Sequence, residues 1–206
     1  MTSLHWPDLR NARDVGGLPT TDGRRIRERA LIRSDDHVRL DPGGVAALRS
    51  YGVSRVVDLR WAWEAAELPS PLAEDLLYRL VPACFDLTGD EVIPVDSYRL
   101  MVDASRERLA AAITAVAQAP PGGVVLHCRE GRDRTGLVVA LALNVAGATV
   151  EGITSDYARS AGSPAYMITN TLRHLDSVYG GVTRYLLGSG VTPTDLAAVR
   201  SRLTDV

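Results

Sequence analysis

One cysteine and one arginine are spaced so that their side chains can act together on a phosphate ester. Cys128 and Arg134 are separated by five residues in the run 127–136, which reads His-Cys-Arg-Glu-Gly-Arg-Asp-Arg-Thr-Gly. A short apolar run, 124–126, leads into this segment, and a longer one, 137–145, leads out of it. The pattern predicts a strand, a tight loop and a buried helix. Such a loop can aim backbone N–H groups and a helix N-terminus at one point, which makes an anion site.

The cysteine of this loop is the candidate nucleophile. A free thiol has a pKa of about 8.5, and a helix N-terminus with nearby cations can lower that pKa to roughly 3.5–7.5. Cys128 would precede such an N-terminus and lie near Arg129, Arg132 and Arg134. We therefore expect a thiolate that attacks phosphorus and forms a cysteinyl-phosphate. The bland alternative, a buried cysteine beside a helix cap, explains fewer features of the run.

The other loop residues can serve the same reaction. Arg134 can fork two phosphate oxygens, and the N–H groups of residues 129–134 can donate to the equatorial oxygens of the transition state. The Thr135 hydroxyl can donate to the sulfur when the sulfur becomes the leaving group. The expected phosphate-binding residues are Arg129, Glu130, Gly131, Arg132, Asp133 and Arg134. The scheme needs neither a metal nor a cofactor, and we expect none.

A second group with chemical potential ends a predicted strand. The β-branched run 53–60 predicts a buried strand, with Asp58 and Arg60 at its exit. In open α/β sheets, ligands gather at the carboxyl ends of the strands. Asp58 is therefore a candidate general acid, and a structural ion pair with an arginine is an equally good explanation.

The rest of the pattern supplies the elements that must position these residues. Strands alternate with helices and are followed by a helical C-terminus, which predicts a single α/β domain over residues 1–206. The predicted elements are short strands within 9–35 around an Asp22-Gly23 turn, helix 42–50 with Asp41 as N-cap, helix 61–68, strand 76–81, one long helix 96–118, and helices near 150–160, 163–179 and 193–204.

Two segments allow two interpretations each. Asn11, Arg13 and Asp14 can form a polar turn network or a wall of the active site. Residues 82–94 can be a plain surface loop or a mobile lid. That segment carries Cys84, Asp86, Asp90 and Glu91.

The composition of the chain argues against some classes of binding partner. The 206 residues are 46% hydrophobic and 23% charged, with a net charge of −2, which argues against wholesale binding of nucleic acid or anionic membranes. No apolar stretch reaches the roughly 18 to 20 residues that span a bilayer, and the N-terminus lacks the pattern of a signal peptide. We expect a cytoplasmic protein, with export without a signal peptide as an open alternative. The two cysteines, Cys84 and Cys128, fit a reduced compartment and a working thiol better than a disulfide.

The motif resembles that of a known family. His127-Cys128-x5-Arg134-Thr135-Gly136 resembles the signature loop of cysteine-dependent protein-tyrosine and dual-specificity phosphatases, and 131–136 is similar to their bacterial tyrosine/serine branch. That branch has a mycobacterial member that also acts on phosphoinositides. Further segments match in the same order, namely 11–17, Arg33-Ser34, 58–60 and 179–186.

The resemblance implies more than the loop alone does. It implies a phosphatase-like fold with a small, mostly parallel sheet flanked by helices. It implies phosphoprotein substrates carrying phosphotyrosine, or phosphoinositides as the alternative, and inhibition by phosphate-like oxyanions. It also implies a general acid, for which Asp58 and Asp133 match the branch's usual candidates. The Trp-Pro-Asp triplet that serves classical tyrosine phosphatases occurs at residues 6–8, ahead of the other motifs, and we interpret it as a coincidence.

Two loop positions depart from the family pattern. Glu130 stands where the family usually has a small residue, so its carboxylate can repel a polyanionic substrate or pair with Arg129 or an arginine of the active-site wall. Arg132 stands where the branch usually has lysine. Arg129 and Arg132 together resemble the basic loop positions of the phosphoinositide 3-phosphatase tumour suppressor, which favours an inositol-phosphate head group, whereas Glu130 argues against it.

Two hypotheses from other classes stay open. One is a catalytically silent module that binds phosphorylated ligands, against which the intact Cys128, Arg134 and Thr135 argue. The other is a thiol redox enzyme that pairs Cys128 with Cys84.

Overall fold

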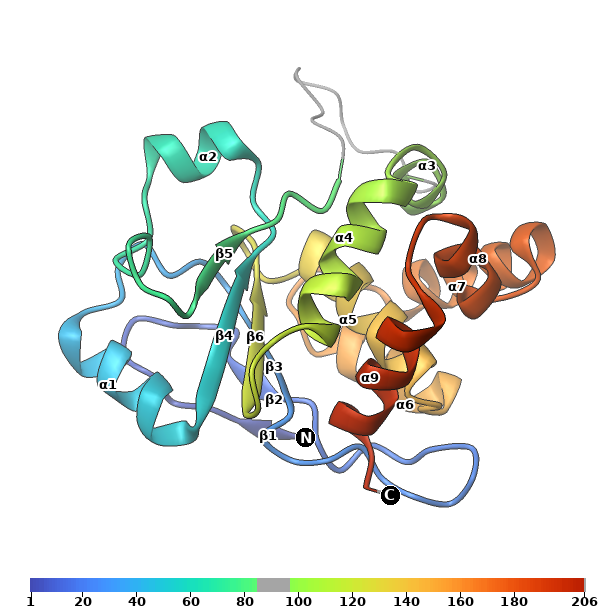
Figure 1. Cartoon of the computed structure of the whole chain (residues 1–206), viewed down its shortest axis with the longest axis horizontal. Coiled ribbons are helices and arrows are strands. Elements are labelled where there is room, and N and C mark those ends of the chain that lie inside the picture. The colour runs from blue at the N-terminus through green and yellow to red at the C-terminus, as the bar shows by residue number, and fades with distance from the viewer. Residues whose placement is uncertain (85–96, 206) are drawn as a thin grey trace.

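A mixed sheet forms the centre of the molecule (Figure 1). The structure is a computed structural model and describes residues 1–84 and 97–205. Within these residues the sheet has six strands in the order β1-β2-β3-β6-β4-β5. They are β1 Thr2–Ser3, β2 Arg13–Asp14, β3 Leu31–Ser34, β4 Val53–Asp58, β5 Tyr78–Leu80 and β6 Gly123–His127. The first three pair antiparallel and the block β3-β6-β4-β5 pairs parallel, so the prediction of an α/β fold with a mostly parallel sheet is confirmed.

Helices cover both faces of the sheet. The helices are α1 Pro42–Tyr51, α2 Ala62–Glu67, α3 Ser97–Ala104, α4 Arg106–Ala117, α5 Asp133–Val145, α6 Val150–Ala158, α7 Ala165–Tyr179, α8 Val182–Gly188 and α9 Pro193–Leu203. In Figure 1, α1 lies on one side of the sheet, and the helices from α3 to α9 gather on the other. None of the helices in the described residues combines the length and apolar character needed to cross a bilayer.

The two faces of the sheet build two separate cores because side chains alternate along each strand. Leu31, Val57 and Leu126 point into the large core around α5, whereas Ile32 and Val56 point into the smaller core under α1. Helix α5 is buried along most of its length, as expected for an apolar run without a polar face. This burial fixes the helix whose N-terminus follows the Cys128 loop.

Several boundaries follow the predicted signals. Asp41 caps α1, since its side chain accepts a hydrogen bond from the N–H of Gly44, and Gly52 ends the helix in the left-handed conformation. The turn at Asp22-Gly23 brings Pro19 and Arg25 into an isolated antiparallel bridge.

Two predictions of helical structure need correction. The long helix 96–118 is in fact two helices, α3 and α4, which meet at Ser105, where φ is −117° and ψ is 24°. Helix α8, over residues 182–188, is absent from the predicted elements. It directly follows Gly180 and Gly181, which both have positive φ. Two consecutive glycines indicate the end of a helix, so the sequence gives no sign that a short helix begins there. The predicted loop 82–94, with its alternative as a lid, lies outside the described residues from 85 onward.

The parallel register aligns three strand ends. Ser34 of β3 and Asp58 of β4 both pair with His127 of β6, so the three residues form one row at the carboxyl edge of the sheet. The Cys128 loop begins at this edge.

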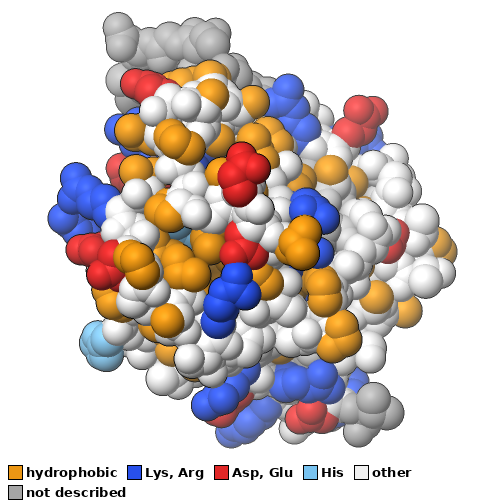
Figure 2. All heavy atoms as spheres, turned by 60° about the vertical axis from the view of Figure 1, so that its left-hand side comes forward, with side chains coloured by type: hydrophobic (Ala, Val, Ile, Leu, Met, Phe, Trp, Pro, Cys, Tyr) orange, Lys and Arg blue, Asp and Glu red, His pale blue; other side chains and the backbone are white. Residues whose placement is uncertain are grey.

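The described surface carries mixed charge. Figure 2 shows arginines and acidic side chains interspersed on one face, with apolar side chains between them. This distribution agrees with the net charge of −2.

Candidate active site

The Cys128 loop connects β6 to α5 and presents unpaired backbone donors. Cys128 is 3% exposed, and α5 begins at Asp133 without a side-chain cap on its first N–H groups. Within the described residues, none of the N–H groups of residues 129–134 donates to a protein acceptor. Free N–H groups at a helix N-terminus make an anion-binding site.

Gly131 is the one loop position where only glycine fits. Its φ is +64°, in the left-handed region. A Cβ at this position would lie 2.3 Å from the carbonyl oxygen of Ser34, closer than side-chain atoms come to the backbone. The close approach brings the loop against the end of β3.

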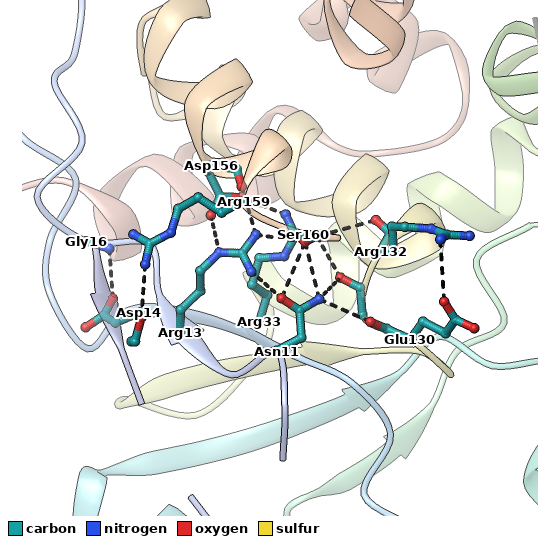
Figure 3. Close-up of polar contacts among 12 residues, drawn as sticks. Asn11, Arg13, Asp14, Gly16, Arg33, Glu130, Arg132, Asp156, Arg159 and Ser160 are labelled. Atoms are coloured by element: carbon teal, nitrogen blue, oxygen red, sulfur yellow. Dashed lines mark hydrogen bonds and ion pairs between the residues drawn. The ribbon is translucent and has the colours of Figure 1, made fainter. Parts of the chain in front are cut away.

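The loop carbonyls are held on the side of β3 and the N-terminal segment (Figure 3). The side-chain amide of Asn11 donates to the carbonyls of Glu130 at 3.1 Å and Gly131 at 3.2 Å. Arg33 also donates to the Gly131 carbonyl, at 2.6 Å. The backbone N–H of Asp36 donates to the Arg129 carbonyl at 3.0 Å.

Two of these donors, Asn11 and Arg33, belong to a buried polar network, which we call the mount. It comprises Asn11, Arg13, Arg33, Asp156 and Ser160. Asp156 binds Arg13 at 2.7 Å and Arg33 at 2.6 Å, and both arginines are almost fully buried. Burial and the charge of Arg33 lower the pKa of Arg13 to about 10, so it stays charged at neutral pH. Of the two interpretations of the Asn11 segment, the structure supports the polar network, although Asn11 also lines a cavity beside the loop.

Arg134 is held from its outer end by Glu64 of α2. Both Nη atoms donate to the Glu64 carboxylate, and the guanidinium lies 4.3 Å from the centre of the Trp61 ring. Burial raises the pKa of Glu64, but the hydrogen bonds from Arg134 and the Trp61 N–H outweigh it and lower the pKa. Guanidinium has five N–H donors, so the Nε edge of Arg134 stays available for a second, bidentate acceptor. The sequence signalled Glu64 only as one acid of a short helix.

Asp58 has two predicted interpretations, as a general acid and as the structural partner of an arginine. It is fully buried, accepts hydrogen bonds from Arg60 and from the Tyr78 hydroxyl, and lies 3.7 Å from His127. Burial raises its pKa, but His127 and Arg60 outweigh that effect and lower the pKa to about 2. The lowered pKa and the hydrogen bonds from Arg60 and Tyr78 suit a stable ion pair. The structure therefore favours the alternative interpretation, a structural pair with an arginine.

Asp133, the other candidate, is the first residue of α5 and partly exposed. Its Oδ1 accepts from the Tyr98 hydroxyl at 2.6 Å, and its Oδ2 accepts from Arg132 at 3.0 Å. Tyr157 in turn donates to Tyr98 at 2.7 Å. Burial raises the pKa of Tyr98, so this hydroxyl keeps its proton and acts as a donor. Nothing in the sequence near Tyr98 or Tyr157 signalled this contact.

Four further side chains near the loop are buried, namely Thr135, His127, His37 and Cys84. The Thr135 hydroxyl has no hydrogen-bond partner in the part of the chain that the structure describes. His127 stacks on His37 with ring centres 4.1 Å apart, and burial lowers the pKa of both rings. Cys84 is a free thiol whose pKa burial raises to about 12, so it is protonated at neutral pH.

A cavity of about 800 Å³ adjoins the loop, and we call its exposed charged lining the rim. On the loop, the rim comprises Arg129, Glu130 and Arg132. Its other charged residues are Asp8, Arg10, Asp35, Asp36, Arg39 and Arg159. Glu130 pairs with Arg132 of its own loop at 3.6 Å, and not with Arg129 or a wall arginine as predicted. Asp8 belongs to the triplet at residues 6–8, whose Trp6 packs into the core under α1.

This geometry was compared with known proteins. A model of the tyrosine phosphatase family matches residues 4–165. The chain belongs to the tyrosine phosphatase family. It is therefore a phosphoric monoester hydrolase that acts on phosphorylated substrates, as the sequence predicted.

Individual relatives agree. The triple specificity protein phosphatase PtpB of Mycobacterium tuberculosis is 33% identical over 198 residues, covering 78% of this chain and 70% of that protein. A putative tyrosine-protein phosphatase of Cupriavidus necator is 26% identical over 89% of this chain and 82% of its own length. Among solved structures, the core catalytic domain of the PP-IP phosphatase SIW14 from S. cerevisiae, in complex with citrate, has the same fold, with a TM-score of 0.51 and 15% identity over 93% of this chain and 98% of that one.

Proposed function

We propose that this phosphatase hydrolyses phosphotyrosine esters through a cysteinyl-phosphate on Cys128. One observation carries the proposal: the N–H groups of residues 129–134 have no protein acceptor among the described residues, and they belong to the loop that joins Cys128 to Arg134. A phosphate ester is a dianion, and such preorganised donors stabilise the charge that develops on its equatorial oxygens. The Nε edge of Arg134 adds a bidentate donor pair.

The first step transfers the phosphoryl group to sulfur. The thiolate of Cys128 attacks phosphorus, the bond from phosphorus to the ester oxygen breaks, and that oxygen takes a proton from Asp133. In the second step water attacks phosphorus and gives its proton back to Asp133, while the bond to sulfur breaks. The Thr135 hydroxyl, which is buried without a partner among the described residues, supplies a hydrogen bond to the departing sulfur. The sequence of steps uses no metal and no cofactor.

Asp133 is preferred over Asp58 as the acid. It adjoins Arg134 in the chain and is 29% exposed, whereas Asp58 is fully buried in its ion pair. An acid must reach the ester oxygen of the bound substrate. The contact from Tyr98 supports a fixed orientation of this carboxylate.

The rim supports a peptide substrate over a phosphoinositide. Five arginines line the cavity together with four acidic residues. One of these arginines, Arg132, already forms an ion pair with Glu130. A polyanionic head group would have to displace Glu130, whereas a peptide with mixed charges matches the lining. Phosphoinositide hydrolysis is the second candidate, because Arg129 and Arg132 both face the same cavity and PtpB is named a triple specificity phosphatase.

Hydrolysis of an aryl phosphate tests the proposal directly. With excess chelator present, the purified protein should release phosphate, and vanadate should inhibit it. Cys128→Ser should lower kcat by on the order of 10³-fold or more, because the nucleophile is lost. Rapid quenching in denaturant should trap phosphate on the protein as a cysteinyl ester.

The second cysteine provides the matched control. Cys84→Ala removes a thiol that is protonated and buried, and it should leave kcat within about twofold. Turnover that survives Cys128→Ser would contradict the proposal. Loss of turnover in Cys84→Ala would instead favour the redox hypothesis, and tight phosphopeptide binding without phosphate release would favour the silent binding module.

A further inference from the structure

Four consecutive carbonyl groups of the Cys128 loop have donors on the side away from the anion site. They belong to residues 129–132, and their donors are the Asp36 N–H, the Asn11 amide and the Arg33 guanidinium. The Arg132 carbonyl also accepts the first helical bond of α5, from the N–H of Gly136. These donors bind the carbonyl oxygens of the loop, whereas the proposed anion would bind the backbone N–H groups of the loop.

Each carbonyl is joined to the N–H group of the next residue through one peptide unit. The trans peptide is planar, so the C=O of one residue and the N–H of the next point in opposite directions. A carbonyl fastened toward the mount therefore turns the following N–H away from the mount. Fastening the carbonyls of residues 129–132 orients the N–H groups of residues 130–133 together.

The Asn11 amide can serve this purpose in only one orientation. Arg13 donates to its Oδ1 at 2.6 Å, and guanidinium has donors only, so the oxygen must face Arg13. The amide NH₂ then faces the loop carbonyls, and Ser160 lies within reach of it at 3.2 Å. Figure 3 shows Asn11 between Arg13 and the loop segment that carries Glu130.

We propose that Asn11 and Arg33 are positioning residues that turn the N–H groups of the Cys128 loop toward the phosphate. The inference rests on the proposed anion site at this loop and adds two residues that bind the carbonyls of the loop rather than the phosphate. Arg33 does this from a fully buried position that its ion pair with Asp156 fixes. Asn11 does it from the edge of the cavity, where a substitution leaves the core intact.

The segment itself provides a matched control in Asp14. Like Asn11, Asp14 is a polar residue that binds backbone groups, but its carboxylate accepts from the N–H groups of Gly16 and Arg29 and from the Tyr51 hydroxyl. Figure 3 shows Asp14 and Gly16 on the far side of Arg13 from the loop. Asp14→Asn therefore disturbs the same segment without touching the loop carbonyls.

The experiment measures oxyanion binding in a form that cannot turn over. Tungstate is titrated by calorimetry into Cys128→Ser, and then into the same protein with Asn11→Ala or with Asp14→Asn added. We expect Asn11→Ala to weaken tungstate binding about tenfold, because the N–H groups of residues 131 and 132 lose their fixed orientation toward the anion. Asp14→Asn should change the dissociation constant by less than about twofold. Thermal unfolding of each variant reports any loss of stability separately.

A second substitution tests the shared carbonyl. Arg33→Lys keeps the charge beside Asp156 but loses the fork that reaches the Gly131 carbonyl. Because Asn11 and Arg33 fasten the same carbonyl, the double variant should weaken binding less than the product of the two single effects.

The outcomes separate the positioning role from the anion site. Unchanged tungstate affinity in Asn11→Ala, or an equal loss in Asp14→Asn, would overturn the positioning role while leaving the phosphatase mechanism intact. A Cys128→Ser protein that binds no tungstate at all would overturn both.

Discussion

The mount and the rim use the same kinds of residue on two sides of one loop and differ in burial. In the mount, the side chains of Arg33 and Asp156 are 0% and 1% exposed, and each has several partners. In the rim, the side chains of Glu130 and Arg132 are 65% and 33% exposed, and their contact is 3.6 Å long. A buried charge that loses its partner is costly, whereas exposed pairs exchange readily with water and salt.

The difference indicates a division of labour. The mount sets the shape of the loop, and its buried ion pairs tie that shape to the stability of the fold. The rim changes its pairing at little cost, so it can respond to the charge of the substrate. The following predictions test this division.

The mount should carry far more stability than the rim. Asp156→Asn leaves Arg13 and Arg33 buried without a full counter-charge, and we expect it to lower the free energy of unfolding by about 3–5 kcal/mol. Glu130→Gln, at the rim, should change it by less than about 0.5 kcal/mol. Urea unfolding followed by circular dichroism measures both. Equal effects of the two substitutions would contradict the division.

The Asp133 carboxylate, next to Arg132 of the rim, should govern proton transfer. Asp133→Asn should lower kcat by about 10²-fold or more for an alkyl phosphate, whose leaving group needs a proton, and by much less for an aryl phosphate with a good leaving group. Tyr98→Phe removes one donor to Asp133 and should show the same dependence on the leaving group with a smaller loss. A loss that is the same for both substrates would remove Asp133 from the role of acid.

Mild acid should lower the free energy of unfolding through two buried histidines, His37 and His127. The pKa values of His37 and His127 are lowered by burial, so the unfolded chain binds more protons than the folded chain below pH 6.5. Stability is therefore complete above that pH and falls as the pH drops, by at most about 1.4 kcal/mol per pH unit for each histidine. The lowered pKa of Asp58 adds a further loss only between about pH 4 and pH 2.

Unfolding curves at pH 7.5 and 5.5 measure this loss. His37→Phe keeps a ring against His127 but removes one titrating group, so the difference between the two curves should shrink. His5→Gln, which removes an exposed histidine, should leave it as it is. A pH dependence that His37→Phe does not change would refute the assignment.

The smallest effect should come from the rim. Glu130→Gln frees Arg132 and should raise the ratio of phosphoinositide to phosphotyrosine-peptide hydrolysis severalfold, an effect of about 1 kcal/mol that salt screens. The ratio of kcat/KM values at low and high salt measures it. An unchanged ratio at low salt would mean that Glu130 does not discriminate between these substrates.

The fold and the centre of the site were largely predictable because their signals are local. The Cys128 loop shows its strand, glycine and helix within one continuous segment, and Asp41 and Gly52 show the ends of α1. The sequence also showed that Asp58 and Arg60 end a buried strand. It did not show which of two roles Asp58 has, since that depends on burial.

The supporting residues could not be predicted because they come from distant elements and belong to common residue types. Glu64 looks like any acid of a short helix, and Tyr98 like any aromatic residue of a helix face. Asp156 lies 143 residues from Arg13, and the hydroxyl of Ser160 lies 149 residues from Asn11. No periodicity or local motif records a partner at that separation.

The span of the mount has a consequence for the order of folding. Loop closure over such separations is entropically costly, and contacts between distant residues form slowly. Helix α5 and the strands can gain structure before the ends of the chain meet, but the Cys128 loop receives the Asn11 amide only when residue 11 meets residues 130 and 131, which lie 119 and 120 positions away in the chain. During refolding, recovery of phosphate-ester hydrolysis should therefore lag behind recovery of the helical circular dichroism signal.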